Sequence, residues 1–334
     1  MTESALVGAA FGEFLEAARS GDGPAGARLA LALIDEGASC DEVILELLAP
    51  TQIEVGAGWL DNDWSVADEH LASGVTQRAL DAVASTVPTS KRRGSIVVTC
   101  AEGDWHSLPA QMFAELLHSH GYEVAFLGAS TPVDHVSRLL ARRYPDALAV
   151  SCTLPIFFAG LTRLADAAHG FGIPVIAGGR ALGKSPARTL RLGGDAWASN
   201  IDTAVSILSG WKRDGKAVAA EATVLDASAR SLDLDAPALA ADGFGSLMAT
   251  YPSMGGYGEG QLARTREDLE YIVRFLAAAS LVEDPTVFSE FLAWLRRLLA
   301  ARAVPDGALT AGLAALAPLV EVVDERAGRV LRET

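Results

Sequence analysis

Five short apolar segments alternate with helix-patterned segments between residues 94 and 214, and this alternation constrains the fold most strongly. The apolar segments read SIVVTC, EVAFLG, ALAVSC, IPVIAGG and DAWAS. The spacing of apolar residues after each of them predicts helices near 107–120, 132–143, 156–171, 184–192 and 201–214. Parallel strands need such crossovers, and right-handed crossovers place helices on both faces of a sheet. The sequence therefore predicts an α/β domain with a flavodoxin-like, doubly wound parallel sheet of five strands.

The segments on either side of this region are predicted to be all helical. Residues 3–86 contain helix-period apolar runs separated by SGDGPAG, GAS and WLDNDW, which indicates about four helices. After residue 215, an Ala- and Asp-rich link leads to three long helical patterns, RTREDLEYIVRFLAAASL, PTVFSEFLAWLRRLLAAR and GALTAGLAALAPLVEVVDERAGRVL. We therefore expect three domains: a four-helix bundle over 1–88, the Rossmann-like α/β domain over 89–215, and a helical domain over 216–334.

Charge and cysteine content narrow the class of protein. A formal net charge of −15 disfavours electrostatic binding to nucleic acid or to anionic lipid. The three cysteines, Cys40, Cys100 and Cys152, are too widely spaced for a disulfide framework or a CxxC metal site. No secretory signal is recognisable, and no run of about 18 apolar residues is free of charges. We expect a cytoplasmic protein that contacts neither nucleic acid nor membrane directly.

The turn after the first predicted strand reads DWHSLP and carries Asp104 and His106. Ligands of doubly wound sheets bind outside the carboxyl ends of the strands, so both side chains should lie in the binding crevice. A carboxylate that accepts the proton of one imidazole nitrogen makes the other nitrogen a better metal ligand. No second His or Cys is nearby, so a metal bound here would bring most of its own ligands, as in a macrocycle. The alternative is an ordinary surface histidine.

DWHSLP resembles the D-x-H-x-x-G signature of the cobalamin-binding fold shared by methionine synthase, methylmalonyl-CoA mutase and their relatives. The resemblance implies that His106 replaces the dimethylbenzimidazole base as the lower ligand of cobalt and that Asp104 supports it. Pro109 stands where the family has glycine. Proline suits the first turn of a helix, so we expect the loop to survive with altered packing at the edge of the corrin.

Two further positions carry the same resemblance. Ser151 and Thr153 follow the third predicted strand in SCTLP, and Gly178 and Gly179 follow the fourth in VIAGGR. The resemblance implies that the hydroxyl groups meet the displaced nucleotide tail and that the glycines let the backbone pass close to it. D-x-H alone is a weak signal, but the three motifs after the correct strands are specific together.

The bundle contains Trp59, followed after nine residues by Glu69 and His70. This pattern resembles the cap of the adenosylcobalamin photoreceptors that regulate carotenoid genes (CarH-like), in which the Trp shields the adenosyl group and the Glu and His contact it. An indole offers a large apolar wall with one donor. The alternative is a tryptophan of the bundle core followed by a Glu-His pair on the helix surface.

Two departures from this pattern change what is expected. Leu60 stands where the photoreceptors have a histidine that ligates cobalt after illumination, so a bis-histidine product would require His70 to move in. The photoreceptors also begin with a winged-helix DNA-binding segment, whereas this chain starts within the bundle, so we expect no direct DNA binding.

The predicted C-terminal domain contains neither His nor Cys, which excludes a haem with a proximal histidine and a thioether-linked chromophore within it. Its run YPSMGGYGEGQLARTR is unusual, and arginines beside aromatic rings can clamp carboxylates while a flat ligand stacks. The candidates are Arg264, Arg266, Tyr271 and Arg274. Exposed helix arginines near a Gly-rich loop are the alternative.

The order of cap, cobalamin domain and helical domain resembles the photocobilins, in which a CarH-like module is joined to a globin-like domain that binds biliverdin. This resemblance implies a light sensor that is not an enzyme, with adenosylcobalamin and biliverdin as cofactors, a homo-oligomeric (dimeric) state and an unknown signalling partner. One alternative is a corrinoid carrier subunit of a methyltransferase or mutase, which uses the same bundle-plus-sheet design. Another is a flavodoxin-like scaffold that binds no corrin.

Overall fold

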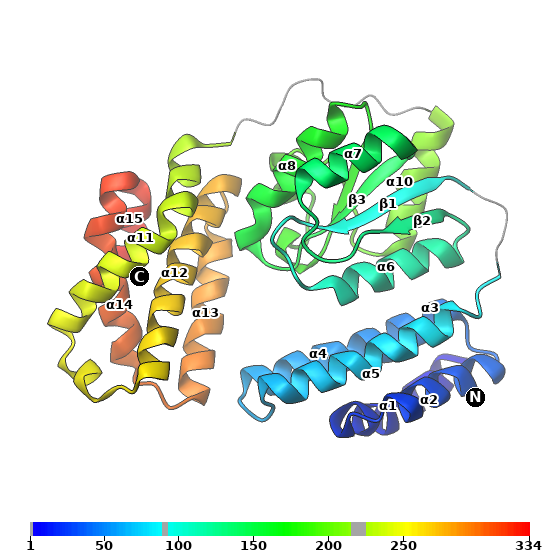
Figure 1. Cartoon of the computed structure of the whole chain (residues 1–334), viewed down its shortest axis with the longest axis horizontal. Coiled ribbons are helices and arrows are strands. Elements are labelled where there is room, and N and C mark those ends of the chain that lie inside the picture. Colours follow the sequence, from blue (N-terminus) through cyan, green and yellow to red (C-terminus); the bar gives the residue numbers. More distant parts are fainter. Residues whose placement is uncertain (1–2, 89–92, 215–224) are drawn as a thin grey trace.

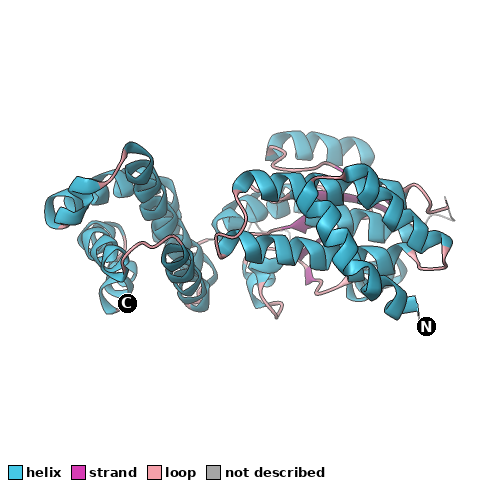
Figure 2. Ribbon diagram, turned by 90° about the horizontal axis from the view of Figure 1, so that it is seen from below, coloured by secondary structure: helices cyan, strands magenta, loops and turns pink. Residues whose placement is uncertain are grey.

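The computed structural model describes residues 3–88, 93–214 and 225–334. The α/β part lies against the N-terminal helices, and the C-terminal helices lie beside both (Figure 1). Residues 89–92 and 215–224, where the two expected domain boundaries fall, lie outside the described residues. The N and C termini lie at opposite ends of the molecule, and Figure 2 shows the C-terminal helices as a body that meets the rest on one side.

The N-terminal part is helical, as predicted. Its elements are α1 (Glu3–Ser20), α2 (Gly23–Asp35), α3 (Cys40–Val43), the π-helical segment η1 (Ile44–Leu48), α4 (Ala49–Leu60) and α5 (Val66–Ala84). α3, η1 and α4 are continuous, so the part makes a bundle of four consecutive helices. Ser39 with Glu42 and Ser65 with Asp68 form capping boxes, in which each serine bonds a backbone N–H of the first turn.

The long helix over Cys40–Leu60 is, by length and composition alone, apolar enough to cross a membrane. One face of it is packed inside the bundle through Val43, Leu47 and Val55. Packing against neighbouring helices accounts for the apolar character of that face.

The middle part is the predicted doubly wound sheet. Its strands are β1 (Ser95–Cys100), β2 (Glu123–Phe126), β3 (Ala147–Ser151), β4 (Val175–Gly178) and β5 (Ala196–Trp197), all parallel in the order β2-β1-β3-β4-β5. The crossovers contain α6 (Ser107–Ser119), α7 (Val133–Arg143), η2 (Pro155–Phe157), α8 (Phe158–His169), η3 (Arg180–Leu182) and α9 (Ala187–Arg191), and α10 (Ile201–Asp214) follows β5. This strand order is flavodoxin-like, and its switch point lies between β1 and β3.

Alternation along β1 explains how the layers are assembled. Ile96 and Val98 point to one face and join the core formed with α6, α10 and the bundle. Val97 points to the other face and joins the core formed with α7, α8 and the C-terminal helices. Because successive strand residues face opposite sides, the apolar run Ile96–Val98 of one strand connects both cores.

The C-terminal part consists of α11 (Ala227–Thr250), η4 (Pro252–Gly256), α12 (Glu259–Val282), α13 (Thr286–Ala301), α14 (Asp306–Val323) and α15 (Glu325–Glu333). The prediction that the Ala- and Asp-rich segment is a link is wrong from residue 227 onward, because these residues form α11. Leu232, Leu239 and Leu247 of that helix are buried in the shared core. The helical pattern over 307–331 is broken at Asp324, whose side chain accepts from Ala327 N at 2.9 Å and begins α15. A globin-like arrangement of these helices stays a prediction.

The C-terminal helices flank the carboxyl edge of the sheet (Figure 1). The turn η2, which follows β3, packs against α12, and α13 reaches the end of α4 in the bundle. Arg188 of α9 donates to Asp284 at 2.8 Å and to Thr286 Oγ1 at 2.9 Å, which attaches the α12–α13 turn to the α/β domain. The edge where a ligand is expected therefore has the bundle and the C-terminal helices as neighbours.

Candidate functional site

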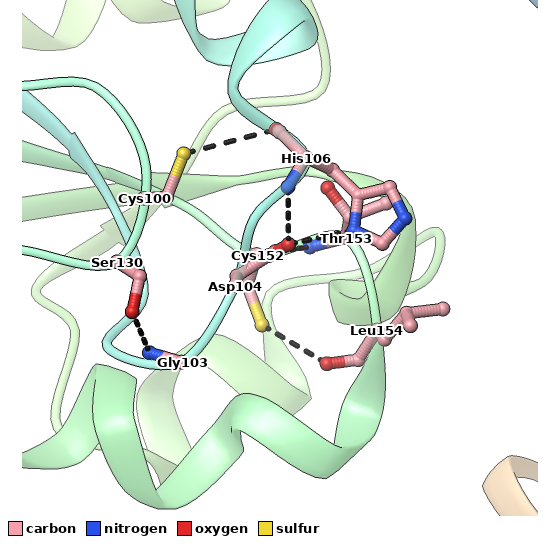
Figure 3. A network of polar contacts seen from close by, with 8 residues as sticks. All are labelled: Cys100, Gly103, Asp104, His106, Ser130, Cys152, Thr153 and Leu154. Atoms are coloured by element: carbon pink, nitrogen blue, oxygen red, sulfur yellow. Dashed lines mark hydrogen bonds and ion pairs between the residues drawn. The ribbon is translucent and has the colours of Figure 1, made fainter. Parts of the chain in front are cut away.

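Asp104 lies at the carboxyl end of β1 and is wholly buried. Its Oδ1 accepts from His106 N at 3.0 Å and lies 2.8 Å from His106 Nδ1, while its Oδ2 accepts from Thr153 N at 2.7 Å (Figure 3). A buried carboxylate is stable only when its oxygens are satisfied in this way. Asp104 thus joins the loop after β1 to the loop after β3, across the switch point of the sheet.

His106 stands at the N-cap position of α6, and its side chain is 52% exposed. A carboxylate can only accept, so Nδ1 donates to Asp104 and Nε2 is left with its lone pair. Within the described part of the chain, no hydrogen bond reaches Nε2. The hydrogen bond to Asp104 raises the pKa of His106, burial opposes this, and the charges of Asp104 and then Glu69 raise it further. The effect of Glu69 shows that the bundle faces this loop.

The loop that holds the pair is tightly built. Gly103 has φ +96°, and a Cβ there would lie 2.9 Å from the ring of Phe157. Ser130, after β2, accepts from Gly103 N at 3.1 Å and donates its own N–H to the carbonyl of Asp104 at 3.0 Å. Sequence reasoning missed Ser130, because it belongs to none of the motifs that carry the resemblance. Its place after the second strand of a parallel sheet was the signal available.

The expected tail-binding residues lie at the same edge. Ser151 ends β3, Thr153 follows it, both are half-buried, and neither hydroxyl has a protein partner among the described residues. Gly179 has φ +111°, and a Cβ there would lie 2.3 Å from the carbonyl oxygen of Cys152. Gly179 is therefore required where the loop after β4 crosses that after β3, and its role with Gly178 beside a ligand stays a prediction.

The cap residues come from two helices of the bundle. Trp59 lies in the last turn of α4, while Glu69 and His70 lie near the start of α5, which begins at Val66 after the capping residue Ser65. Glu69 accepts from Ser73 Oγ at 2.9 Å. His70 is 74% exposed, and its Nε2 lies 3.4 Å from Glu69. Glu69 thus lies near the His106 loop, and His70 points largely to solvent.

The four C-terminal candidates do not converge on one point. Arg264 and Tyr271 are exposed and lie seven residues apart on α12, which places them on one face. Arg266 lies over the ring of Phe244 at 4.1 Å. Arg274 pairs at 2.8 Å with the glutamate four residues before it. Arg266 and Arg274 therefore already have protein partners.

Sequence reasoning also missed three residues of α13 and its C-terminal end that contact the end of α4. They are Trp294, Arg297 and Arg302. No local pattern could have selected them, because their partners lie more than 230 residues earlier in the chain.

The donor set of the site fits a metal that arrives inside a macrocycle. In the described ranges, no group of three or more His, Cys, Asp or Glu side chains could hold a bare metal ion. His106 nevertheless offers one nitrogen whose orientation is set by a buried carboxylate, which is the usual support of a metal-binding imidazole. One nitrogen ligand suffices for a metal whose other ligands come from a corrin ring.

Comparison with known families agrees with this chemistry. Residues 94–206 match a family model described as a B12 binding domain, and residues 11–84 match a second model of the same description. The chain contains B12 binding domains. This confirms the resemblance to the cobalamin-binding fold and supports cobalamin binding by the bundle and sheet, whereas the photocobilin type stays a prediction.

Two individual proteins extend the comparison. The HTH-type transcriptional repressor CarH of Myxococcus xanthus is 30% identical over 140 residues, which are 41% of this chain and 46% of the repressor. The match therefore spans about half the length of that relative. The fold resembles that of the Methanosarcina barkeri monomethylamine corrinoid protein, with a TM-score of 0.52, 18% identity, and coverage of 59% of this chain and 95% of that one.

Proposed function

We propose that the protein is a light sensor that binds adenosylcobalamin, with His106 as the lower ligand of its cobalt. The observation that carries this proposal is the buried Asp104, which orients His106 and leaves Nε2 unbonded at the carboxyl edge of the sheet. Further support comes from the similarity to CarH and from the cap residues, which resemble those of adenosylcobalamin photoreceptors. When bound, the cofactor would supply a Co–C bond that light can break.

Residues of the sheet domain would bind the lower side of the cofactor, and residues of the bundle would cover its upper side. Asp104 holds His106 in one tautomer, and the free hydroxyls of Ser151 and Thr153 can bind the nucleotide tail. Trp59 and Glu69 come from the bundle and cover the opposite side. Loss of the upper group would remove contacts that hold the bundle against the sheet, and a shift between these two bodies is the proposed signal.

The C-terminal domain is proposed to bind biliverdin. Arg264 and Tyr271 support this idea, because they lie exposed on one face of α12, where a guanidinium can bind a propionate and a phenol ring can stack. The output is proposed to be a change in a homo-oligomer, a dimer, that is read by a partner protein.

The test is an absorbance spectrum of protein loaded in the dark with adenosylcobalamin and biliverdin, gel-filtered, and recorded before and after green light. We expect a bound corrin spectrum that changes on illumination, with bilin absorption retained by the protein. His106→Ala should weaken retention of cobalamin, whereas His135→Ala, at an exposed position of α7, should not. A corrin that stays bound and unchanged in light would contradict the sensor.

A corrinoid carrier subunit of a methyltransferase or mutase is the second candidate. Leu60 favours it, because the residue after Trp59 offers no atom that could ligate cobalt after loss of an upper group. A carrier would bind methylcobalamin and transfer the methyl group to or from a partner enzyme. Methyl transfer assayed with candidate partners, together with stability in light, would identify it.

A further inference from the structure

Trp59 belongs to the bundle by sequence but is held by the C-terminal domain. Its indole packs against the core that the sheet shares with the C-terminal helices, whereas Trp64 packs in the core of the bundle. The ring stacks on Trp294 of α13, with centroids 6.2 Å apart and planes at 21°. The guanidinium of Arg302 lies 5.0 Å from the ring centroid. The orientation of the indole is therefore set largely by α13 and the residue that follows it.

The backbone beside Trp59 is held by the same domain. Arg302 Nη2 donates to the carbonyl of Trp59 and Nη1 to that of Leu60, both at 3.3 Å. Arg297 donates to Asp61, the C-cap of α4, at 2.8 Å. The last carbonyls of a helix lack intrahelical partners and carry partial negative charge, so arginines are favourable there. Ring and backbone of Trp59 are thus fixed from outside the bundle.

The contact continues into the interior of the C-terminal domain. Trp294 lies 6.1 Å from Phe291, and Phe291 stacks on Phe275 at 3.9 Å with planes at 8°. Both phenylalanines are buried, so this part of the stack is embedded in a packed core. Trp294 itself is 37% exposed, so this end of the stack reaches the solvent.

We propose that Trp294 and Arg302 are positioning residues of the upper side of the cobalamin site, which hold Trp59 and thereby set a preference for a large upper ligand. The inference rests on the proposed function, because it assumes that Trp59 faces the upper ligand. An adenosyl group has ring and ribose surfaces that an indole can cover, whereas a methyl group offers a single carbon. Only the affinity for the adenosyl form therefore depends on where the indole is held.

The experiment measures dissociation constants for adenosylcobalamin and methylcobalamin in the dark, with the full chain and four variants. Trp294→Leu and Arg302→Met should each lower affinity for adenosylcobalamin about tenfold and change that for methylcobalamin less than about twofold. Trp294→Phe retains a ring and should restore most of the preference. Arg296→Met is the matched control, because Arg296 is an exposed arginine of α13 with no hydrogen bond or ion pair to any described residue.

A second readout needs no cofactor. Near-ultraviolet circular dichroism of the ligand-free protein should lose intensity in Trp294→Leu, since two stacked indoles couple, and should be unchanged in Arg296→Met. Equal loss of affinity for both cobalamins, or no loss for either, would overturn the inference while leaving cobalamin binding by the wild type intact. A wild-type protein that bound neither cobalamin would overturn the proposed function and this inference together.

Discussion

The two sides of the candidate cobalamin site are built in opposite ways. On the lower side, Asp104 is wholly buried and connects two strand-end loops through hydrogen bonds of 2.7 to 3.0 Å. On the upper side, His70 is 74% exposed, and Trp59 lies at a helix end that a different domain holds. The lower side is rigid because buried polar groups must keep their partners, while the upper side depends on contacts between separate bodies.

This difference suits a sensor. In the proposed sensor, a fixed lower ligand would retain the cofactor, and an adjustable upper side would move when the upper group changes. Any signal would pass through the contacts of α4 with α13, since these connect Trp59 to the C-terminal core. We expect substitutions on the two sides to differ in effect as strongly as the contacts of the two sides differ.

The largest effect is expected from Asp104→Ala. The change removes a wholly buried carboxylate that accepts from the N–H groups of His106 and Thr153, and we expect a loss of about 3 kcal/mol in the free energy of unfolding. Urea denaturation of the ligand-free protein measures it. The control is Asp134→Ala, which removes an exposed carboxylate paired with Arg138 and should change stability by less than about 0.5 kcal/mol. Similar losses for both variants would contradict a rigid lower side.

The next effect is expected from Gly179→Ala. A side chain at φ +111° and 2.3 Å from the carbonyl of Cys152 forces the two loops apart, at a cost of about 2 kcal/mol in unfolding free energy. Gly74→Ala is the matched control, because Gly74 lies exposed within α5 with nothing within 4 Å of a new Cβ. That variant should be more stable than the wild type by up to about 1 kcal/mol. Thermal unfolding compares the two.

The sequence predicted the α/β domain well because its signals are local. Each strand is an apolar run, and Asp104 and His106 lie at the end of the first, where the topology of a parallel sheet places binding residues. The segment over residues 227–250 was missed as a helix, since its buried leucines are diluted by Ala and Asp and it contains Pro237. Its helical state is decided by packing against other helices, which no local pattern records.

The contacts of Trp59 could not be predicted from the sequence for a related reason. Its aromatic character and its spacing from Glu69 can be read from the sequence, so Trp59 could be selected as a candidate, and its role in the site stays a prediction. The residues that hold it, Trp294 and Arg302, are brought there only by the docking of a whole domain. Ser130 is different, because its place after a strand of the parallel sheet can be read from the sequence, although none of the motifs of the resemblance includes it.

The free energy of cobalamin binding at the lower side should change by about 1.4 kcal/mol per pH unit below the pKa of His106, because binding displaces one proton. The pKa of His106 lies above its ordinary value of 6.5, so in the ligand-free protein its pairing with Asp104 stabilises most below pH 6.5 and is lost as pH rises through the raised pKa. The pH dependence of cobalt binding at Nε2 has the opposite sign: binding becomes stronger as pH rises, because it needs the unprotonated nitrogen.

Affinity for cobalamin should therefore rise about tenfold per pH unit and level off above a midpoint higher than 6.5. Titration of binding by absorbance from pH 5 to 9 measures this midpoint. Asp104→Asn should lower it, since the hydrogen bond to Asp104 is the main cause of the raised pKa. The profile of His106→Ala should be flat, and an unchanged slope in that variant would exclude His106 as the titrating ligand.

The smallest effect is expected from His70→Ala. A side chain 74% exposed contributes less than about 0.5 kcal/mol to the free energy of unfolding. Loss of its proposed contact with the upper ligand should lower the affinity for adenosylcobalamin about threefold, as for the loss of one exposed hydrogen bond. Isothermal titration measures the affinity. A loss as large as that of His106→Ala would show that the upper side is as fixed as the lower one.

The most direct test of the account is electron paramagnetic resonance of the protein loaded with the Co(II) form of cobalamin after growth on ¹⁵N-labelled histidine. We expect each cobalt line to be split into a doublet by the ¹⁵N of His106, where unlabelled protein gives a triplet. A triplet that is unchanged by labelling would come from the dimethylbenzimidazole of the cofactor, and it would contradict His106 as the lower ligand.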